Sequence, residues 1–315
     1  MYYFGQRYPK ICVCATRHSG LSCPVPVLYG PAMDTIKANG LEFGYLSAGP
    51  LDGPLALCLH GFPDSAYTWR HLLPTLAEEG YHAVAPFMRG YAPTSVPADG
   101  AYQTGALAAD VNALHEALGG GSDAVLIGHD WGAAAVYGAA AHAPSRWRKV
   151  VAMSVPPLAS MLSSFFAYEQ LRRSFYIFLF QTPLAPLALN RDFVAGLWKD
   201  WSPGYDAFGD VSQVMECLAT PDRIEAAIGY YRAMLDPSLH VEAYASEQEA
   251  CSAVGERPVL YLHGAADGCL AAGSIGDPLP HLPPGSCMEI VPDAGHFLQL
   301  EQPSAVASHI LDWLR

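Results

Sequence analysis

The chain has 315 residues, of which 51% are hydrophobic, so it is long enough to bury one large core. Its formal net charge is −13, and no run of Lys or Arg interrupts this acidic balance. Because nucleic acids and anionic membrane surfaces bind clustered positive charge, we expect neither as a partner.

The amino-terminal region, residues 1–32, carries three cysteines and four prolines without a clear period. We expect an extension, either a loose tail or a stretch upstream of a true start at Met33. It lacks the pattern of a secretory signal, and the eight cysteines of the chain show no paired CxxC spacing. Reduced thiols and the absence of a membrane-spanning apolar stretch predict a cytoplasmic protein.

From Met33 onward, continuous apolar runs alternate with helical patterns, which is typical of a mainly parallel sheet covered on both faces. The expected buried strands are Leu55–His60, His82–Pro86, Ala124–Ile127, Val150–Met153, Val259–Leu262 and Met288–Val291. The expected helices are Trp69–Glu79, Gly105–Leu118, Ala133–Ala143 and Ala305–Leu314.

The alternation stops over residues 157–250, which are rich in aromatic side chains and in helix-compatible sequence. We therefore predict a helical lid inserted into an α/β core made of residues 33–156 and 251–315. Such a lid is expected over the carboxyl edge of the sheet, where open α/β sheets bind their ligands.

Residues Gly128-His129-Asp130-Trp131-Gly132 lie between an expected buried strand and a helix of small residues. Glycines on both sides of one reactive side chain are typical of a nucleophile elbow, a sharp turn that exposes the nucleophile. Here that position holds Asp130. The alternative interpretation is that Asp130 only caps the following helix.

A second motif, His60-Gly61-Phe62-Pro63, follows the first of these strands. In an elbow enzyme this loop donates one backbone N–H to an oxyanion hole, and the residue after the nucleophile donates another. The sequence predicts these donors at Phe62 and Trp131.

An acid and a base should follow the nucleophile in the chain. Asp267 and His296 each come directly after a late strand, which predicts Asp267 as the acid and His296 as the base. Asp293 is a weaker candidate for the acid, and the position after the strand ending at Met153 holds Ser154. We expect His60 and His129 to be structural.

These motifs resemble those of the α/β-hydrolase superfamily, and HGFPD with GHDWG is similar to its epoxide hydrolase branch. The resemblance extends from about Met33 to the end of the chain. It implies the α/β-hydrolase fold, an aspartate nucleophile, and two lid tyrosines that hold the epoxide oxygen.

The lid tyrosines are assigned by matching two segments of this family. Tyr176 begins the match to Tyr-x-x-x-Phe-Gln, and Tyr231 with Arg232 matches the aromatic-Tyr-Arg segment. Tyr230 remains an alternative to Tyr231.

A carboxylate nucleophile favours attack on saturated carbon, because an alkyl ester forms there whereas attack on an ester would give a mixed anhydride. The resemblance therefore implies a hydrolase that opens a small apolar epoxide with water, needing neither cofactor nor metal. Haloalkane and haloacid dehalogenases share this chemistry and are the alternative. A ligand-binding protein of the same fold is a further alternative, and a homodimer is left open.

Overall fold

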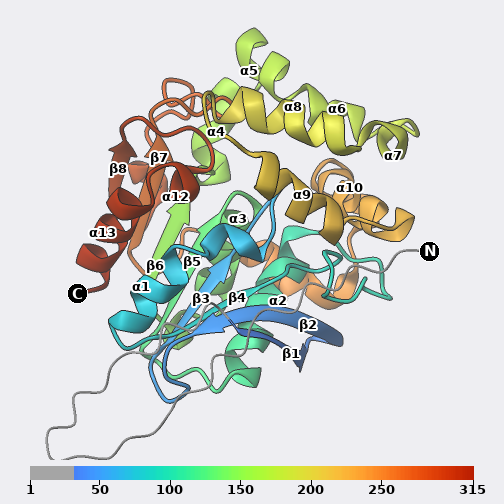
Figure 1. Cartoon of the computed structure of the whole chain (residues 1–315). Helices are drawn as coiled ribbons and strands as arrows, with labels where there is room; N and C mark the ends of the chain where they lie inside the picture. Colours follow the sequence, from blue (N-terminus) through green and yellow to red (C-terminus); the bar gives the residue numbers. More distant parts are fainter. Residues whose placement is uncertain (1–31) are drawn as a thin grey trace, which may run out of the picture.

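A computed structural model describes residues 32–315, in which eight strands form a single sheet of order β1-β2-β4-β3-β5-β6-β7-β8 (Figure 1). The strands are β1 (Ala32–Ala38), β2 (Leu41–Ala48), β3 (Leu55–Leu59), β4 (His82–Pro86), β5 (Ala124–His129), β6 (Trp147–Met153), β7 (Val259–Gly264) and β8 (Cys287–Val291). All pairings from β4 to β8 are parallel, so the predicted mainly parallel α/β sheet is confirmed. The extension predicted over residues 1–32 lies, except for its last residue, outside the described part.

The centre of the sheet is buried on both faces. Every residue of β3, β4, β5 and β7 is buried, as their continuous apolar sequences predict. The strand β8 has exposed residues instead, because it lies at the edge of the sheet with only β7 beside it. The nucleophile motif therefore follows a strand that is fully buried in the centre of the sheet.

The hairpin of β1 and β2 is absent from the strands expected above. These strands pair antiparallel with each other, and β2 pairs antiparallel with β4. A two-residue turn at Asn39 and Gly40 joins them, and both residues have positive φ, at 44° and 73°. Asn-Gly is the preferred sequence for this turn, since both residues tolerate the left-handed conformation.

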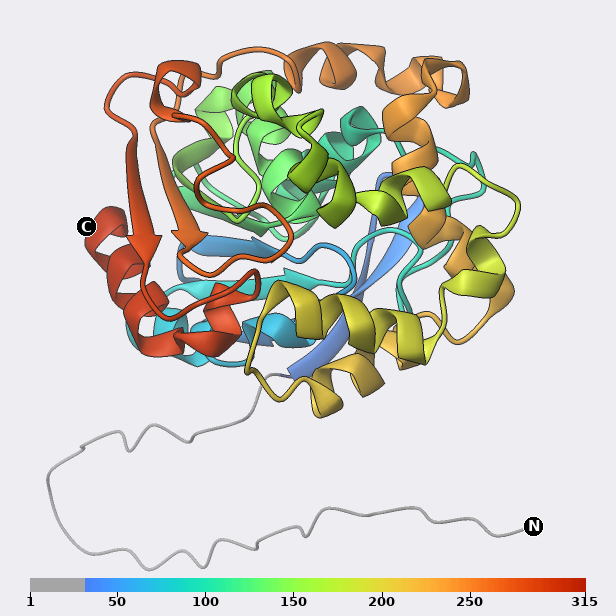
Figure 2. The ribbon, with the colours of Figure 1, turned by 90° about the horizontal axis from the view of Figure 1, so that it is seen from above.

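Helices cover both faces of the sheet, as the turned view in Figure 2 shows. On one face, α1 (Leu72–Glu78) packs against α13 (Pro303–Leu314), and on the other α2 (Thr104–Ala117) packs against α3 (Trp131–His142). All four predicted core helices are present, with ends close to the expected residues. No helix in the described part of the chain is long and apolar enough to cross a membrane.

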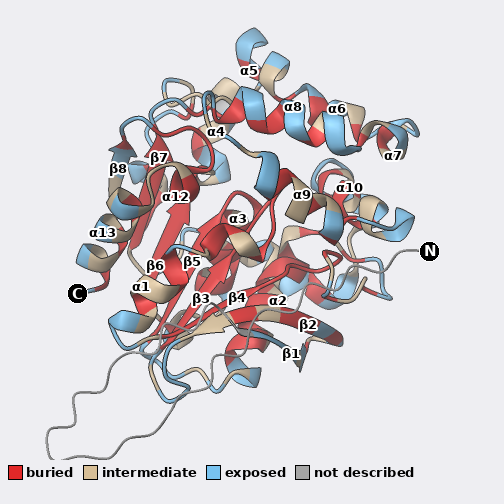
Figure 3. Cartoon of the chain, in the orientation of Figure 1, coloured by how far each residue is buried: buried red, intermediate tan, exposed pale blue. Residues whose placement is uncertain are grey.

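Between β6 and β7, the regular structure of the described chain is entirely helical. We refer to α4 to α10 as the cap, which lies over the carboxyl ends of the strands (Figure 1). The helices are α4 (Leu158–Phe165), α5 (Tyr168–Arg173), α6 (Phe175–Leu179), α7 (Ala185–Ala188), α8 (Arg191–Trp201), α9 (Phe208–Cys217) and α10 (Pro221–Leu235). The next helix, α11 (Ala245–Ala250), packs against α2 and α3 of the core. Figure 3 shows that the cap helices bury the sides that face inward.

Candidate active site

The turn between β5 and α3 places Asp130 in a backbone conformation that non-glycine residues rarely adopt. Its φ is 54° and its ψ is −118°. A Cβ atom on Gly128 would overlap the carbonyl of Gly132, and one on Gly132 would overlap that of Leu59. Glycines are therefore needed on both sides of the turn, as in a nucleophile elbow. The Asp130 side chain makes no capping hydrogen bond to α3, which excludes the cap interpretation.

The loop after β3 holds one oxygen of this carboxylate. The Phe62 N–H donates to Asp130 Oδ1 at 2.7 Å. A Cβ atom on Gly61 would overlap both the Asp130 side chain and the Trp131 backbone nitrogen. The loop and the elbow are therefore in close contact here, next to the two expected oxyanion donors, the N–H groups of Phe62 and Trp131. On the cap side, the Trp198 indole donates to the Pro63 carbonyl at 2.8 Å.

His60 supports this loop through backbone contacts. Its Nδ1 donates to the Gly61 carbonyl at 2.9 Å, and its Nε2 accepts from the Met88 N–H at 3.0 Å. Burial lowers the pKa of His60 to about 4, so its ring is neutral at physiological pH.

The loops after β7 and β8 bring Asp267 and His296 together. His296 Nδ1 donates to Asp267 Oδ2 at 2.9 Å, and His296 Nε2 lies 3.7 Å from Asp130 Oδ2. The other oxygen of Asp267 accepts from the backbone N–H groups of Cys269 and Leu270, at 2.7 and 2.9 Å. Asp267 therefore accepts three hydrogen bonds, and the one from Nδ1 fixes the orientation of the imidazole.

The other acid considered in the sequence does not contact the base. Asp293 is an exposed turn residue with a φ of 54°, and its carbonyl accepts a hydrogen bond from Gln302. Ser154 and His129 instead support the His296 backbone. The Ser154 hydroxyl and His129 Nε2 donate to the His296 carbonyl at 2.7 and 2.8 Å.

Tyr176 on α6 and Tyr231 on α10 meet above Phe62. Their ring centroids are 5.4 Å apart, and the Tyr231 ring lies 5.2 Å from that of Phe62. Both tyrosines are buried. Within the described residues, the Tyr231 hydroxyl has no hydrogen-bond partner, whereas that of Tyr176 lies 3.8 Å from the sulfur of Cys269.

Tyr230 adjoins Tyr231 on α10 and also lines the cavity, but its hydroxyl bonds to the core. Its buried hydroxyl donates to the Arg89 carbonyl at 2.8 Å, on the core side of the cap. The Arg89 side chain is fixed in turn by an ion pair with Asp110 at 2.6 Å. The Tyr230 hydroxyl is thus already used in a structural contact.

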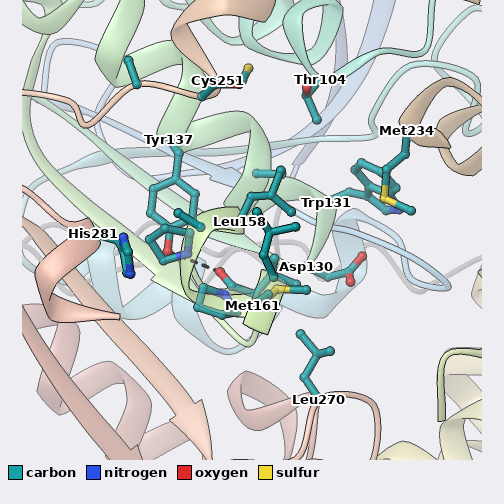
Figure 4. Close-up of a pocket in the computed structure, with 18 of the residues that line it drawn as sticks. Thr104, Asp130, Trp131, Tyr137, Leu158, Met161, Met234, Cys251, Leu270 and His281 are labelled. Atoms are coloured by element: carbon teal, nitrogen blue, oxygen red, sulfur yellow. Dashed lines mark hydrogen bonds between the residues drawn. The ribbon is translucent and has the colours of Figure 1, made fainter. Parts of the chain in front are cut away.

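Asp130, Tyr176 and Tyr231 line one cavity of about 510 Å³ between the cap and the core. Figure 4 shows Asp130 and His281 on different sides of this cavity, with Leu158 and Met161 of α4 beside it. Most of the lining is apolar, and the carboxylate is one of few charged groups that face it. A cavity of this size and lining suits an apolar small molecule.

Comparison with known proteins places this arrangement in a family. Residues 54–303 match the model of the alpha/beta hydrolase fold. The chain is 31% identical to epoxide hydrolase A of Mycobacterium tuberculosis, over 90% of this chain and 97% of that protein. It belongs to the epoxide hydrolase branch of the α/β-hydrolase superfamily. The predicted α/β-hydrolase fold and its branch are confirmed.

Two further relatives of this hydrolase agree with that placement. Epoxide hydrolase 3 of Xenopus tropicalis is 31% identical over 89% of this chain and 76% of its own length. The crystal structure of epoxide hydrolase A from Mycobacterium thermoresistibile superimposes with a TM-score of 0.75 and 28% identity, covering 90% of this chain and 98% of that one.

The electrostatics of the hydrolase centre on His296. Burial opposes its protonation, but the charge of Asp267 and the contacts with Asp130 outweigh burial and raise the pKa of His296 to about 10. Burial also acts against the charge of Asp267, yet the His296 imidazolium holds the pKa of that acid below its usual range. Burial, together with the Asp130 charge, raises the pKa of Tyr231 well above that of a free phenol.

One residue at the site was not predicted from the sequence. Cys269 lines the cavity, contacts Tyr176, and donates its backbone N–H to the acid. Its position two residues after Asp267 was the available signal, because a loop that carries a catalytic acid also faces the site.

Proposed function

We propose that this hydrolase opens an epoxide to a vicinal diol through an alkyl ester on Asp130. The observation that carries the proposal is that the elbow carboxylate shares one cavity with two buried tyrosines and lies 3.7 Å from His296 Nε2. Because Oδ1 is held by the Phe62 N–H at 2.7 Å, Oδ2 is the oxygen that attacks. Attack forms the bond from Oδ2 to carbon and breaks the bond from that carbon to the epoxide oxygen.

The developing alkoxide needs a proton. The Tyr231 hydroxyl, which has no other partner among the described residues, supplies it with assistance from Tyr176. The Asp130 ester is neutral, so His296 loses the negative partner that faced its Nε2 in the free enzyme. The pKa of His296 falls as a result, so the imidazolium returns a proton to the Tyr231 phenolate and becomes a neutral base.

His296 then takes a proton from water, which attacks the ester carbon of Asp130. The oxyanion that forms on Oδ1 is stabilised by the Phe62 N–H and by that of Trp131. Breaking the bond between the carbonyl carbon and Oδ2 releases the diol, whose oxygen takes the second proton of that water. Asp130 is then a carboxylate again, and His296 is again the imidazolium of the free enzyme. Asp267 holds the imidazole through both proton transfers.

The proposal is tested by incubating the purified protein with aryl and aliphatic epoxides and, in parallel, with haloalkanes. We expect diol from epoxides, no halide from haloalkanes, and no product from Asp130→Asn. Halide release without diol would instead support the dehalogenase alternative. Ligand binding without any turnover would support the binding alternative.

A further inference from the structure

The loop that carries the catalytic acid, Asp267–Leu270, is held from above by the cap. Arg173 of α5 donates from Nη1 to the Gly268 carbonyl at 2.7 Å. Gln170, one turn earlier on α5, donates from Nε2 to the Cys269 carbonyl at 2.9 Å. Gln170 is buried, so its loss would leave that carbonyl without a replacement from solvent.

A single backbone carbonyl of the cap joins this loop to the base. The Trp201 carbonyl, at the end of α8, accepts from the Gly268 N–H and from the His296 N–H, both at 3.0 Å. A Cβ atom on Gly268 would overlap the Asp200 carbonyl, and one on Gly295 would overlap the Trp201 carbonyl. Both loops therefore lie directly against the end of α8.

The nucleophile is held by different parts of the chain. The Asp130 N–H donates to the Met153 carbonyl at 3.2 Å, and its Oδ1 accepts from Phe62 at 2.7 Å. Both partners belong to the core. The acid loop is thus attached to the cap, and the His296 backbone is attached both to the cap and, through Ser154 and His129, to the core. The two bonds that hold Asp130 are both to the core.

We infer that the cap sets the alignment of His296 and Asp267 and that Gln170 and Arg173 are positioning residues for hydrolysis of the ester. This inference rests on the proposed function, in which alkylation uses Asp130 and the tyrosines, and hydrolysis uses His296 with Asp267. When the acid loop is held less firmly, hydrolysis of the ester slows, whereas alkylation of Asp130 keeps its rate.

The test compares Arg173→Ala with Arg172→Ala. Arg172 is the matched control because it adjoins Arg173 but is exposed and pairs only with Glu169 on the surface. With the best epoxide from the screen, we expect Arg173→Ala to lower kcat roughly tenfold, the usual effect of losing one charged hydrogen bond. KM should fall in parallel, so that kcat/KM stays near the wild-type value, because the ester accumulates.

Intact mass measurement after rapid acid quench reports the ester directly. The esterified fraction at steady state should rise in Arg173→Ala and in Gln170→Leu, and Arg173→Lys, which keeps a donor, should restore hydrolysis. Arg172→Ala should match the wild type.

If kcat and kcat/KM fall by the same factor and no ester accumulates, the inference is wrong. That pattern means that less of the protein is active, which is the result of a merely structural role. If the wild type turns over the epoxide but Arg173→Ala shows the same kinetics and ester level as Arg172→Ala, the inference is wrong and the proposed function stands. A wild-type protein that forms neither ester nor diol would overturn the proposed function, and the inference with it.

Discussion

His296 Nε2 lies 3.7 Å from Asp130 Oδ2, and within the described residues that nitrogen has no hydrogen-bond partner. The pair is therefore an ion pair with space between the groups, not a closed hydrogen bond. While Asp130 is a carboxylate, it favours the protonated imidazole, and the pKa of His296 is raised to about 10. The proposed mechanism follows from this relationship, because only esterification of Asp130 releases His296 to act as a base.

Folding stability should depend on pH through His296. An unfolded His titrates near pH ~6.5, whereas this imidazole titrates at about 10 in the folded protein. Since the folded-state pKa is the higher one, its stabilisation is fully present below the unfolded pKa and is lost as pH rises through the folded pKa. The midpoint of thermal unfolding should fall more steeply on raising the pH from neutral to alkaline in the wild type than in His296→Asn. Parallel slopes for the two proteins would contradict the assigned ion pair.

Replacing His296 should separate the two chemical steps. In His296→Gln the nucleophile is intact, so an epoxide should still alkylate Asp130, but hydrolysis should slow by at least roughly a hundredfold. Intact mass should show one added epoxide per chain. The double variant with Asp130→Asn is the control and should gain no mass. Prompt diol release by His296→Gln would show that another group serves as the base.

Adjacent tyrosines on α10 should behave differently. Tyr231→Phe removes the unpaired hydroxyl, so the alkylation rate should fall roughly tenfold or more while Tyr176 still donates. Tyr230→Phe removes the bond to the Arg89 carbonyl and should cost about 1 kcal/mol of stability without slowing alkylation. Single-turnover kinetics and denaturant unfolding measure the two effects. The reverse pattern would make Tyr230 the lid acid.

Glycine substitutions should reveal the constraint at the elbow. Gly132→Ala places a Cβ atom against the Leu59 carbonyl, so we expect little folded protein or a loss of several kcal/mol. Gly196 lies on the exposed side of α8 with open space around it, and Gly196→Ala should stabilise the protein by about 0.5–1 kcal/mol. Unfolding midpoints provide the comparison. A tolerated Gly132→Ala would show that the turn is not strained.

Much of the core was predictable because buried parallel strands have continuous apolar sequences. Leu55–Leu59 and Val259–Gly264 are such strands, and the residues after them supply the Phe62 loop and Asp267. The β1 and β2 hairpin was missed because these strands are partly exposed at the edge of the sheet. The Asn39-Gly40 pair was the signal that predicts it.

The cap contacts were not predictable from the sequence. Gln170 and Arg173 show no motif, and their partners are backbone carbonyls nearly a hundred residues away. Backbone acceptors carry no sequence signature, so such contacts appear only in the fold. The choice between Tyr230 and Tyr231 was equally local, because neighbouring residues of α10 differ in hydroxyl contacts. The Tyr230 hydroxyl bonds to the Arg89 carbonyl, and that of Tyr231 has no partner among the described residues.

An ester on Asp130 would leave an oxygen atom of water in the protein, so oxygen exchange detects it. A single turnover of epoxide in heavy-oxygen water, followed by peptide mass spectrometry, locates the oxygen taken from water. We expect heavy oxygen in the peptide that contains Asp130 and none in the first diol released, because that diol takes its oxygen from the carboxylate. Heavy oxygen in the first diol, with an unlabelled Asp130 peptide, would mean that water attacks the epoxide directly.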